Sequence, residues 1–460
     1  MPCARVRRIY ELSSEQSRIV LIILMVLIST VSPVGYHMVI LNVPEKLIQT
    51  ALKEEIADDF NVDLADGSLK LLWSFIVAAQ SVGALVGCLL LIPLEKAMGV
   101  KNTLLIFNNG VLFVSSLCLF VAYYWETTLL LLFGRLLIGI YTGLGTALLP
   151  IYIQELAPTK IKGALSCLIH IAVLFGAAAA GLLSLNVFLG RRSTWHILLA
   201  LPALCCIVQT TFARFLPHTP GFYLSKGQSL KAADSIRYYY KIYASDDADA
   251  YSQLVAKYPD QWSFSSAMKS RRTRRALGLG MIISGAQIFT GAMATVSYST
   301  SMFESVSIFS SLVSLFPTLG SVFSILLSLP ALRLVESCGR KRLMITTLIA
   351  CATANYVLCG VSVITQYIMN LGIVGTIAIF LSFLLLGVGY NLGVGPLGFF
   401  LPGELVDVHY DGRHPSFLKK TLPETKDGGG SNSSSLVLSC NAYTPEEEEE
   451  ESAAVYGTFD

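Results

Sequence analysis

The sequence predicts an all-α, polytopic membrane protein, and three observations carry that prediction. Of the 460 residues, 53% are hydrophobic and only 14% are charged. A globular domain carries about 25% charged residues, so this chain lacks the polar surface that a water-soluble fold needs. The apolar residues gather in runs of about 20 or more, the length at which a helix crosses a bilayer. The balance of 33 basic against 31 acidic residues argues against a nucleic-acid-binding protein.

About ten apolar runs follow one another, and each is interpreted as a membrane-spanning helix. They cover approximately residues 19–41, 69–94, 102–123, 127–150, 164–189, 194–216, 276–302, 307–332, 343–364 and 371–401. A polar interruption separates the first six runs from the last four. We therefore expect an N-terminal transmembrane half (1–216), a cytoplasmic central loop with short helices (217–275), a C-terminal transmembrane half (276–404) and a largely disordered acidic cytoplasmic tail (405–460).

Loop charges orient these helices. Lysine and arginine are enriched before the first run, throughout 217–275, and between the eighth and ninth runs, whereas the segment 42–68 is acidic. Because positively charged loops stay on the cytoplasmic side, both termini are expected in the cytoplasm and 42–68 outside.

The ten cysteines form no recognisable disulfide or metal pattern. Seven lie inside apolar runs and three on the expected cytoplasmic side, so no outer loop carries a cysteine pair. No spacing matches a zinc site, and neither a nucleophile–base set nor a phosphate-binding loop is evident. The sequence therefore predicts a protein that is not an enzyme and that uses no cofactor or metal.

Ionisable residues within spans, or at their cytoplasmic ends, are the first candidate functional groups. They are His37, Arg135, Glu155, His170 and Glu404. A charge in a bilayer is costly, and its alternative explanation is a side chain that snorkels to the interface. Two recurring patterns favour function for the charged ones. A Leu-Pro pair precedes a glutamate in both 149–155 and 401–404, and the link 99–101 recurs as 339–341, as in a two-half transporter.

Glycines mark two of the spans as unusual. Residues 134–145 hold four glycines at a spacing that lets helices approach closely. Residues 387–398 hold five glycines and Pro396, a composition that disfavours a continuous helix. Irregular backbone persists in a membrane only where protein buries it or where it lines a cavity. We therefore expect either a kinked helix or a broken gating helix beside a substrate path.

Four sequence motifs carry a family resemblance. Residues 35–44 read GYHMVILNVP, 134–135 are Gly-Arg ahead of YIQELAP at 152–158, 336–341 read ESCGRK, and 423–426 read PETK. In this order and at these span positions, the sequence resembles the sugar porters of the major facilitator superfamily, in particular the animal facilitative glucose transporters. The resemblance implies a major facilitator fold, with a six-helix N-half and, here, an incomplete C-half of about four helices.

The resemblance also implies a function and a site. It implies facilitative transport of a hexose-type sugar by alternating access. The expected location is the plasma membrane, and the expected partners are a small-molecule substrate and the lipid bilayer. The resemblance leaves self-association open. The implied substrate-binding residues are His37, His170, Gln287, Asn391 and Phe399. Several of these residues differ from the polar residues that the family has at the same positions. A hexose site needs many hydrogen-bonding groups to bind the sugar hydroxyls. Another small solute is therefore an alternative substrate, and His37 is interpreted as a hydrogen-bonding side chain more readily than as a proton carrier.

A cytoplasmic charge network, called the latch here, is the second implied feature. In the family it holds the two halves together in the outward-open state. The implied N-half members are Arg135, Glu155 and Lys162, and the C-half members are Glu336, Arg340, Lys341, Glu404 and Arg413. One exposed ion pair contributes little, but a network biases a two-state equilibrium by a few kcal/mol.

A short segment near the C-terminus departs most from the family. The family has two further helices between the tenth-span glutamate and the PETK motif, but here only residues 405–422 intervene. Two crossings need about 40 residues. The sequence therefore predicts a sugar porter without the eleventh and twelfth helices, and a non-transporting or regulatory isoform is the alternative function.

Overall fold

The computed structural model describes most of the chain up to the end of the last apolar run. The described residues are 14–42, 44–60, 65–125, 127–157, 162–240, 268–269, 271–292, 295, 316–364 and 372–405. They belong to one compact unit, Met1–Arg413. Helices account for nearly all of them, which confirms the all-helical class. Within this part of the chain, eight helices are long and apolar enough to cross a membrane.

The first six expected spans are all helical. The N-terminal elements are α2 (Ser14–Val39), α3 (Glu45–Phe60), α4 (Asp66–Asn102), the π-helical turn η1 (Thr103–Phe107), α5 (Asn108–Tyr124), α6 (Thr128–Leu156), α7 (Lys162–Leu183), α8 (Trp195–Ala200) and α9 (Ala203–Ala213). The sixth span is interrupted between α8 and α9 by a turn at Leu201 and Pro202. Proline cannot donate the backbone hydrogen bond that would continue α8.

The later elements follow the expected order with shifted boundaries. They are α10 (Pro220–Ser225), α11 (Ser229–Tyr240), α14 (Arg271–Phe289), α17 (Phe316–Ser337), α18 (Arg340–Val363), α19 (Gly372–Gly389), the π-helical turn η4 (Tyr390–Val394) and α20 (Gly395–Leu405). Helix α14 begins five residues before the expected span, inside the expected central loop. The proposed gap at 405–422 and the acidic tail lie, apart from Leu405, outside the described residues.

The acidic segment 42–68 contains a helix that the sequence did not predict. Helix α3 is polar, and its acidic side chains bind neighbouring elements. Glu55 Oε1 accepts hydrogen bonds from the backbone N–H of Thr128, 2.7 Å away, and from the Thr128 hydroxyl at 2.8 Å. Glu54 forms an ion pair with Arg192. A carboxylate at the start of α6 is favourable because the first N–H groups of a helix have no intrahelical partner.

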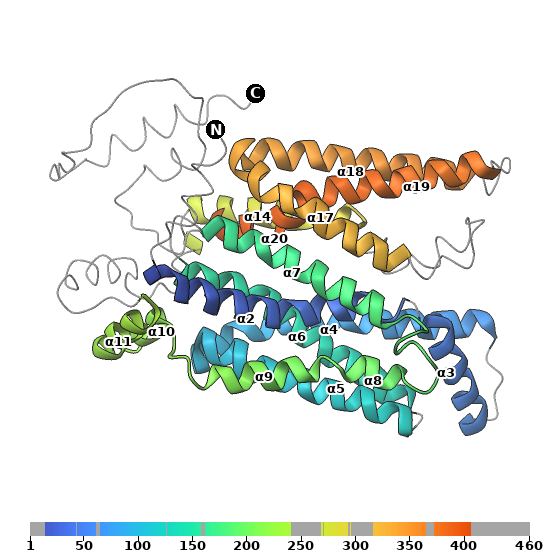
Figure 1. The fold of residues 1–460 in the computed structure, drawn as a ribbon, viewed down its shortest axis with the longest axis horizontal. Helices are drawn as coiled ribbons and strands as arrows, with labels where there is room; N and C mark the ends of the chain where they lie inside the picture. The colour runs from blue at the N-terminus through green and yellow to red at the C-terminus, as the bar shows by residue number, and fades with distance from the viewer. Residues whose placement is uncertain are drawn as a thin grey trace. The chain divides into compact units, whose positions relative to one another are not determined.

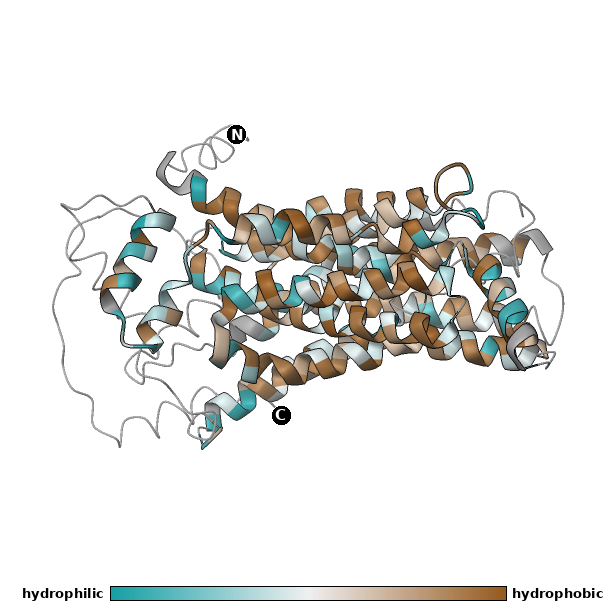
Figure 2. Cartoon of the chain, turned by 90° about the horizontal axis from the view of Figure 1, so that it is seen from below, coloured by the Kyte–Doolittle hydropathy of each residue, from teal (hydrophilic) through white to brown (hydrophobic). Residues whose placement is uncertain are grey.

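Helix α7 lies between two groups of helices. It packs against α2 on one side and against α17 and α20 on the other, and Figure 1 shows α18 and α19 beyond α17. The two short helices α10 and α11 lie near the end at which α2 begins, and Figure 2 shows hydrophilic residues concentrated on them, in contrast to the long apolar helices.

Glycines bring α4 and α6 into backbone contact, as the 134–145 spacing predicts. A Cβ atom added to Gly139 would lie 2.2 Å from the Gln80 carbonyl oxygen, and one added to Gly143 would lie 2.1 Å from the Ala84 carbonyl oxygen. On the facing helix, a Cβ on Gly83 would lie 2.0 Å from the Leu136 carbonyl oxygen. No side chain fits between the two backbones, so this pair of helices has one closely determined separation.

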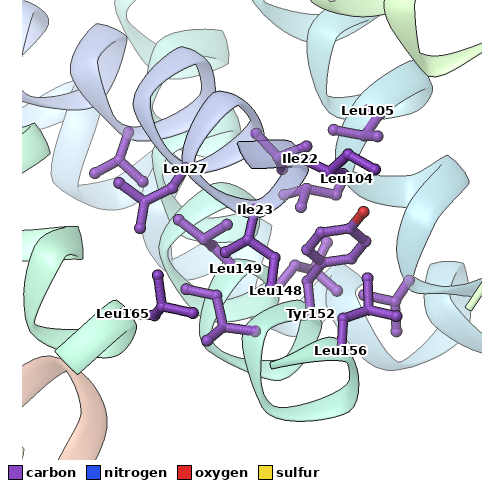
Figure 3. Packing of buried hydrophobic residues seen from close by; sticks show 14 of the residues in the cluster. Ile22, Ile23, Leu27, Leu104, Leu105, Leu148, Leu149, Tyr152, Leu156 and Leu165 are labelled. Carbon is purple, nitrogen blue, oxygen red and sulfur yellow. The ribbon is translucent and has the colours of Figure 1, made fainter. Parts of the chain in front are cut away.

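The core near the start of α2 joins four transmembrane elements to α11. Figure 3 shows Tyr152 of α6 surrounded by aliphatic side chains of α2, η1, α6 and α7. The Tyr239 side chain of α11 belongs to the same buried cluster, and its hydroxyl donates to the Pro217 carbonyl oxygen at 2.9 Å. Helix α11 is thereby anchored to the transmembrane bundle.

The short links 99–101 and 339–341 share one backbone conformation. Gly99 has φ of 77° and ψ of 159°, and Gly339 has φ of 80° and ψ of 144°. Only glycine adopts this region at little cost. The sequence pattern that suggested an internal repeat therefore corresponds to a repeated backbone turn.

Candidate substrate site and cytoplasmic cluster

The glycine-rich tenth span contains a π-helical turn, with α19 before it and α20 after it. This geometry is an interrupted but still helical chain, intermediate between the two expectations of a kink and a break. The glycines make room for side chains from three other helices. A Cβ added to Gly393 would lie 2.3 Å from Thr347 Oγ1, and a Cβ added to Gly395 would lie 2.7 Å from the His170 imidazole.

His170 of α7 reaches this interrupted helix directly. Its side chain is only 2% exposed, and its Nε2 lies 3.0 Å from Asn391 Oδ1 of η4. The Asn391 amide nitrogen donates to Ser324 Oγ of α17 at 3.0 Å and to the Gly387 carbonyl oxygen at 2.8 Å. One polar cluster therefore joins an N-terminal helix to two C-terminal ones.

Gln287 of α14 completes the cluster with weaker bonds. Its amide nitrogen donates to the Tyr390 hydroxyl and to the Gly395 carbonyl oxygen, at 3.4 Å in each case, which is long for an N–H···O bond. The ring of His170 lies 5.7 Å from that of Tyr390 and 6.1 Å from that of Phe399, between ring centroids. The site is therefore polar on one side and aromatic on the other.

Four of the five expected substrate residues thus come together: His170, Gln287, Asn391 and Phe399. Sequence reasoning missed two further members, Tyr390 and Ser324. Tyr390 could have been found as the hydroxyl next to Asn391 in the glycine-rich run. Nothing local distinguishes Ser324 from the other serines of its span.

His37 lies at a different place. It is in the last turn of α2, is 0% exposed, and has its ring edge-on to Tyr36 with 5.7 Å between centroids. Among the described residues, no hydrogen bond or ring contact joins it to the four clustered side chains. Its backbone carbonyl oxygen instead accepts a 3.2 Å bond from Arg135 Nη1.

The expectation that Arg135 belongs to the cytoplasmic latch is wrong. Arg135 is 2% exposed, and besides the His37 carbonyl it donates to Gln80 Oε1 at 2.7 Å. Two hydrogen bonds show that α6 runs antiparallel to α2. Arg135, the earlier residue in α6, donates to the carbonyl oxygen of His37, the later residue in α2, and Tyr141 donates to the carbonyl oxygen of Thr30. Twenty residues, about 30 Å of helix, separate Arg135 from Glu155, so the two belong to opposite ends of α6.

Of the other expected latch residues, the structure describes some completely and others only in their backbone or not at all. Glu155 is in the last turn of α6, Lys162 begins α7, and Arg340 begins α18 ahead of Lys341. An added Cβ on Gly163 would lie 3.8 Å from Arg340 Nη2, so the start of α18 meets the start of α7. The backbones of Glu336 and Glu404 lie in α17 and α20, but their side chains and all of Arg413 are outside the described residues.

The short helix α10 covers the turn at Gly99. An added Cβ at Gly99 would lie 2.5 Å from the Phe222 ring, and His218 stacks on that ring with 4.6 Å between centroids and 22° between planes. Ser235 of α11 donates to the His218 carbonyl oxygen at 2.6 Å. Burial, reinforced by the nearby Lys101 ammonium, lowers the pKa of His218.

Comparison of the sequence with known protein families shows the family to which the chain belongs. Residues 22–410 match the family described as "Sugar (and other) transporter". The chain belongs to that family. It is therefore a multi-pass membrane transporter with a small-solute substrate, and the family is not one of enzymes.

Relatives and solved structures agree with this membership. The chain is 27% identical over 386 residues to the human facilitated glucose transporter member 4 of solute carrier family 2, covering 81% of this chain and 73% of that protein. It is 26% identical over 397 residues to mouse member 7, covering 85% and 76%.

The fold resembles two structures of a bacterial sugar symporter. One is the major facilitator superfamily proton:xylose symporter XylE bound to 6-bromo-6-deoxy-D-glucose, with a TM-score of 0.67, 18% identity and 85% of each chain covered. The other is a partially occluded inward-open conformation of the xylose transporter XylE from E. coli, with a TM-score of 0.65, 20% identity, and 85% of this chain and 89% of that chain covered. The major facilitator fold expected from the sequence is thereby confirmed.

Proposed function

We propose that this protein is a facilitative transporter of hexose-type sugars that works by alternating access. The single observation that carries the proposal is the polar cluster in which His170 of α7 meets Asn391 of η4 and Gln287 lies nearby. In transporters built from two halves, the substrate site lies at the interface of the repeats, often at a discontinuous helix. Imidazole and amide groups hydrogen-bond sugar hydroxyls, and Phe399 supplies an apolar ring face.

The charged residues assigned to the latch support the alternating-access part of the proposal. Glu155 and Lys162, at the ends of α6 and α7, lie on the side where Arg340 and Lys341 begin α18. We assign them, with Glu336, Glu404 and Arg413, to a latch that opens when the site faces the cytoplasm. Arg135 is left out of this latch and is assigned to the N-half core near His37.

The proposal also covers the membrane, the orientation and the energy coupling of the protein. The basic loops support a cytoplasmic location for both termini, and the resemblance to animal glucose transporters favours the plasma membrane. Since Arg135 holds the His37 carbonyl and, within the described part of the chain, no hydrogen bond engages the His37 ring, we assign His37 a structural place and propose transport without proton coupling.

Two observations favour different second candidates. Ile288, where the family carries a glutamine, is 67% exposed and turned out of the cluster, so the site offers a hexose fewer polar groups and suits another small solute. The short segment 405–422 favours a chain without the eleventh and twelfth helices, and hence a non-transporting isoform.

One experiment separates these candidates. Purified protein in sealed vesicles is tested for uptake of labelled hexoses, beside a version with two helices restored after Arg413. Saturable uptake by the chain itself supports the proposal, and uptake by the restored form alone supports the non-transporting isoform. A folded restored form that moves no hexose supports another solute.

A further inference from the structure

The Asn391 side chain has no hydrogen-bonding capacity to spare on its nitrogen. A primary amide donates two hydrogen bonds, and here both are used, to Ser324 Oγ at 3.0 Å and to the Gly387 carbonyl oxygen at 2.8 Å. Both acceptors belong to the C-terminal helices α17 and α19. The amide is therefore fixed in one orientation by its own half of the protein, with Oδ1 directed at His170.

This orientation determines where the imidazole hydrogen of His170 lies. An amide oxygen can only accept, so the 3.0 Å contact is a hydrogen bond only if His170 Nε2 carries hydrogen. A neutral imidazole has one N–H group, and Nδ1 is then an acceptor with a free lone pair. In the part of the chain that the structure describes, that Nδ1 is buried and has no partner. A buried acceptor without a donor is unfavourable, and a ligand donor would remove that cost.

The surroundings of His170 leave few other donors. The ring lies beside the Tyr390 and Phe399 rings, and Gly395 presents no side chain at all, since a Cβ there would lie 2.7 Å from His170 Cε1. Among the described residues, no hydrogen bond joins the Tyr390 hydroxyl to His170. The acceptor atom thus sits at the contact between α7 and the interrupted helix, and substrate sites in two-half transporters lie at the interface of the halves.

We propose that Asn391 is a positioning residue that holds His170 in the Nε2–H form, so that His170 Nδ1 accepts a hydrogen bond from a hydroxyl of the substrate. This inference rests on the proposed transport function and deepens it, because it changes Asn391 from a substrate contact to a support for one. It also defines the substrate class at this position. The solute must carry a hydroxyl donor, and replacing that hydroxyl by fluorine or a methyl ether, which accept but do not donate, removes the bond.

The tautomer is measured without any assay of transport. The full-length chain, labelled with ¹⁵N-histidine and held in lipid nanodiscs, contains six histidines, and H170Q identifies the His170 signals. We expect the spectrum of a neutral imidazole with hydrogen on Nε2, and a shift of the bare Nδ1 signal when D-glucose is added. Hydrogen on Nδ1 in the wild-type protein overturns the inference, whether or not the protein transports sugar.

Variants at Asn391 separate positioning from direct contact. In N391D, a carboxylate favours the imidazolium, which has no acceptor nitrogen. Uptake by N391D should therefore lose about tenfold in apparent affinity at mildly acidic pH and recover at alkaline pH, whereas N391L should be impaired at every pH.

Fluorinated sugars complete the test in the wild-type protein. Among deoxyfluoro-D-glucoses, one position should compete at least about tenfold more weakly than D-glucose, and H170L should abolish that difference. Equal competition by every derivative, or N391D with a pH profile identical to wild type, refutes the positioning role. The expected tautomer in a protein that binds no sugar would instead refute the proposed function and leave the imidazole assignment intact.

Discussion

The contact between α4 and α6 makes a quantitative prediction for Gly139→Ala. The added Cβ would lie 2.2 Å from the Gln80 carbonyl oxygen, 2.7 Å from Gly83 Cα and 2.9 Å from the Ala84 nitrogen. All three are backbone atoms, so no side chain can rotate away. Restoring an ordinary carbon–oxygen contact of about 3.2 Å requires the two helices to separate by about 1 Å.

The cost is the balance of three effects. Overpacking of this kind costs about 1–3 kcal/mol. Separation of α4 from α6 also lengthens the 2.7 Å bond between Arg135 and Gln80, one turn away, and a hydrogen bond to a charged group contributes about 1.5–3 kcal/mol. Alanine regains about 1 kcal/mol through its helix propensity. If the bond is lost completely, the net loss of stability is therefore about 1.5–5 kcal/mol.

The measurement is the apparent melting temperature of purified protein in detergent, followed by size-exclusion chromatography after heating. We expect Gly139→Ala to melt several degrees below wild type. The matched control is Gly110→Ala in α5, where an added Cβ meets nothing within 4 Å, and this variant should melt at or above the wild-type temperature. If the two variants behave alike, the close backbone contact between α4 and α6 is refuted.

Three further predictions test other contacts. Gln80→Leu deprives the buried Arg135 guanidinium of an acceptor and should destabilise the protein by about 1–3 kcal/mol, a loss that the double variant with Arg135→Met should partly reverse in melting experiments. Burial and the Lys101 ammonium lower the pKa of His218, so the unfolded chain binds the proton more readily. Stability is therefore retained above about pH 6.5 and lost as the pH falls below it, and melting curves of His218→Gln should lack this slope. Gly395→Ala places a Cβ 2.7 Å from the site imidazole and should reduce uptake at least about tenfold at an unchanged amount of folded protein.

The transmembrane helices were predictable because their signal is local. Runs of about 20 apolar residues locate α2, α6 and α7 within a few positions, and the glycine spacing of 134–145 predicted the close approach of α6 to another helix. Helix α3 was missed because its 16 residues are polar and have no membrane signal. Its helical state is supported by tertiary bonds from Glu54 and Glu55, which no local pattern reveals.

The site was predictable to a different extent. His170, Gln287, Asn391 and Phe399 were found because the family motifs place them in register, although they lie on the four separate elements α7, α14, η4 and α20. Arg135 was misplaced because sequence shows that a charge lies within a span but not at which depth its partners lie. The 20 residues of α6 between Arg135 and Glu155, together with the bonds of Arg135 to the His37 carbonyl and to Gln80, place Arg135 at the end of α6 away from Glu155.

Sugar uptake by the purified full-length chain tests the central claim most directly. We expect labelled D-glucose to enter sealed vesicles saturably and without an applied proton gradient, with unlabelled sugar inside accelerating entry. The double variant His170→Leu/Gln287→Leu should lose this uptake while it remains folded. A wild-type protein that is folded, correctly inserted and unable to exchange any labelled hexose would contradict the claim.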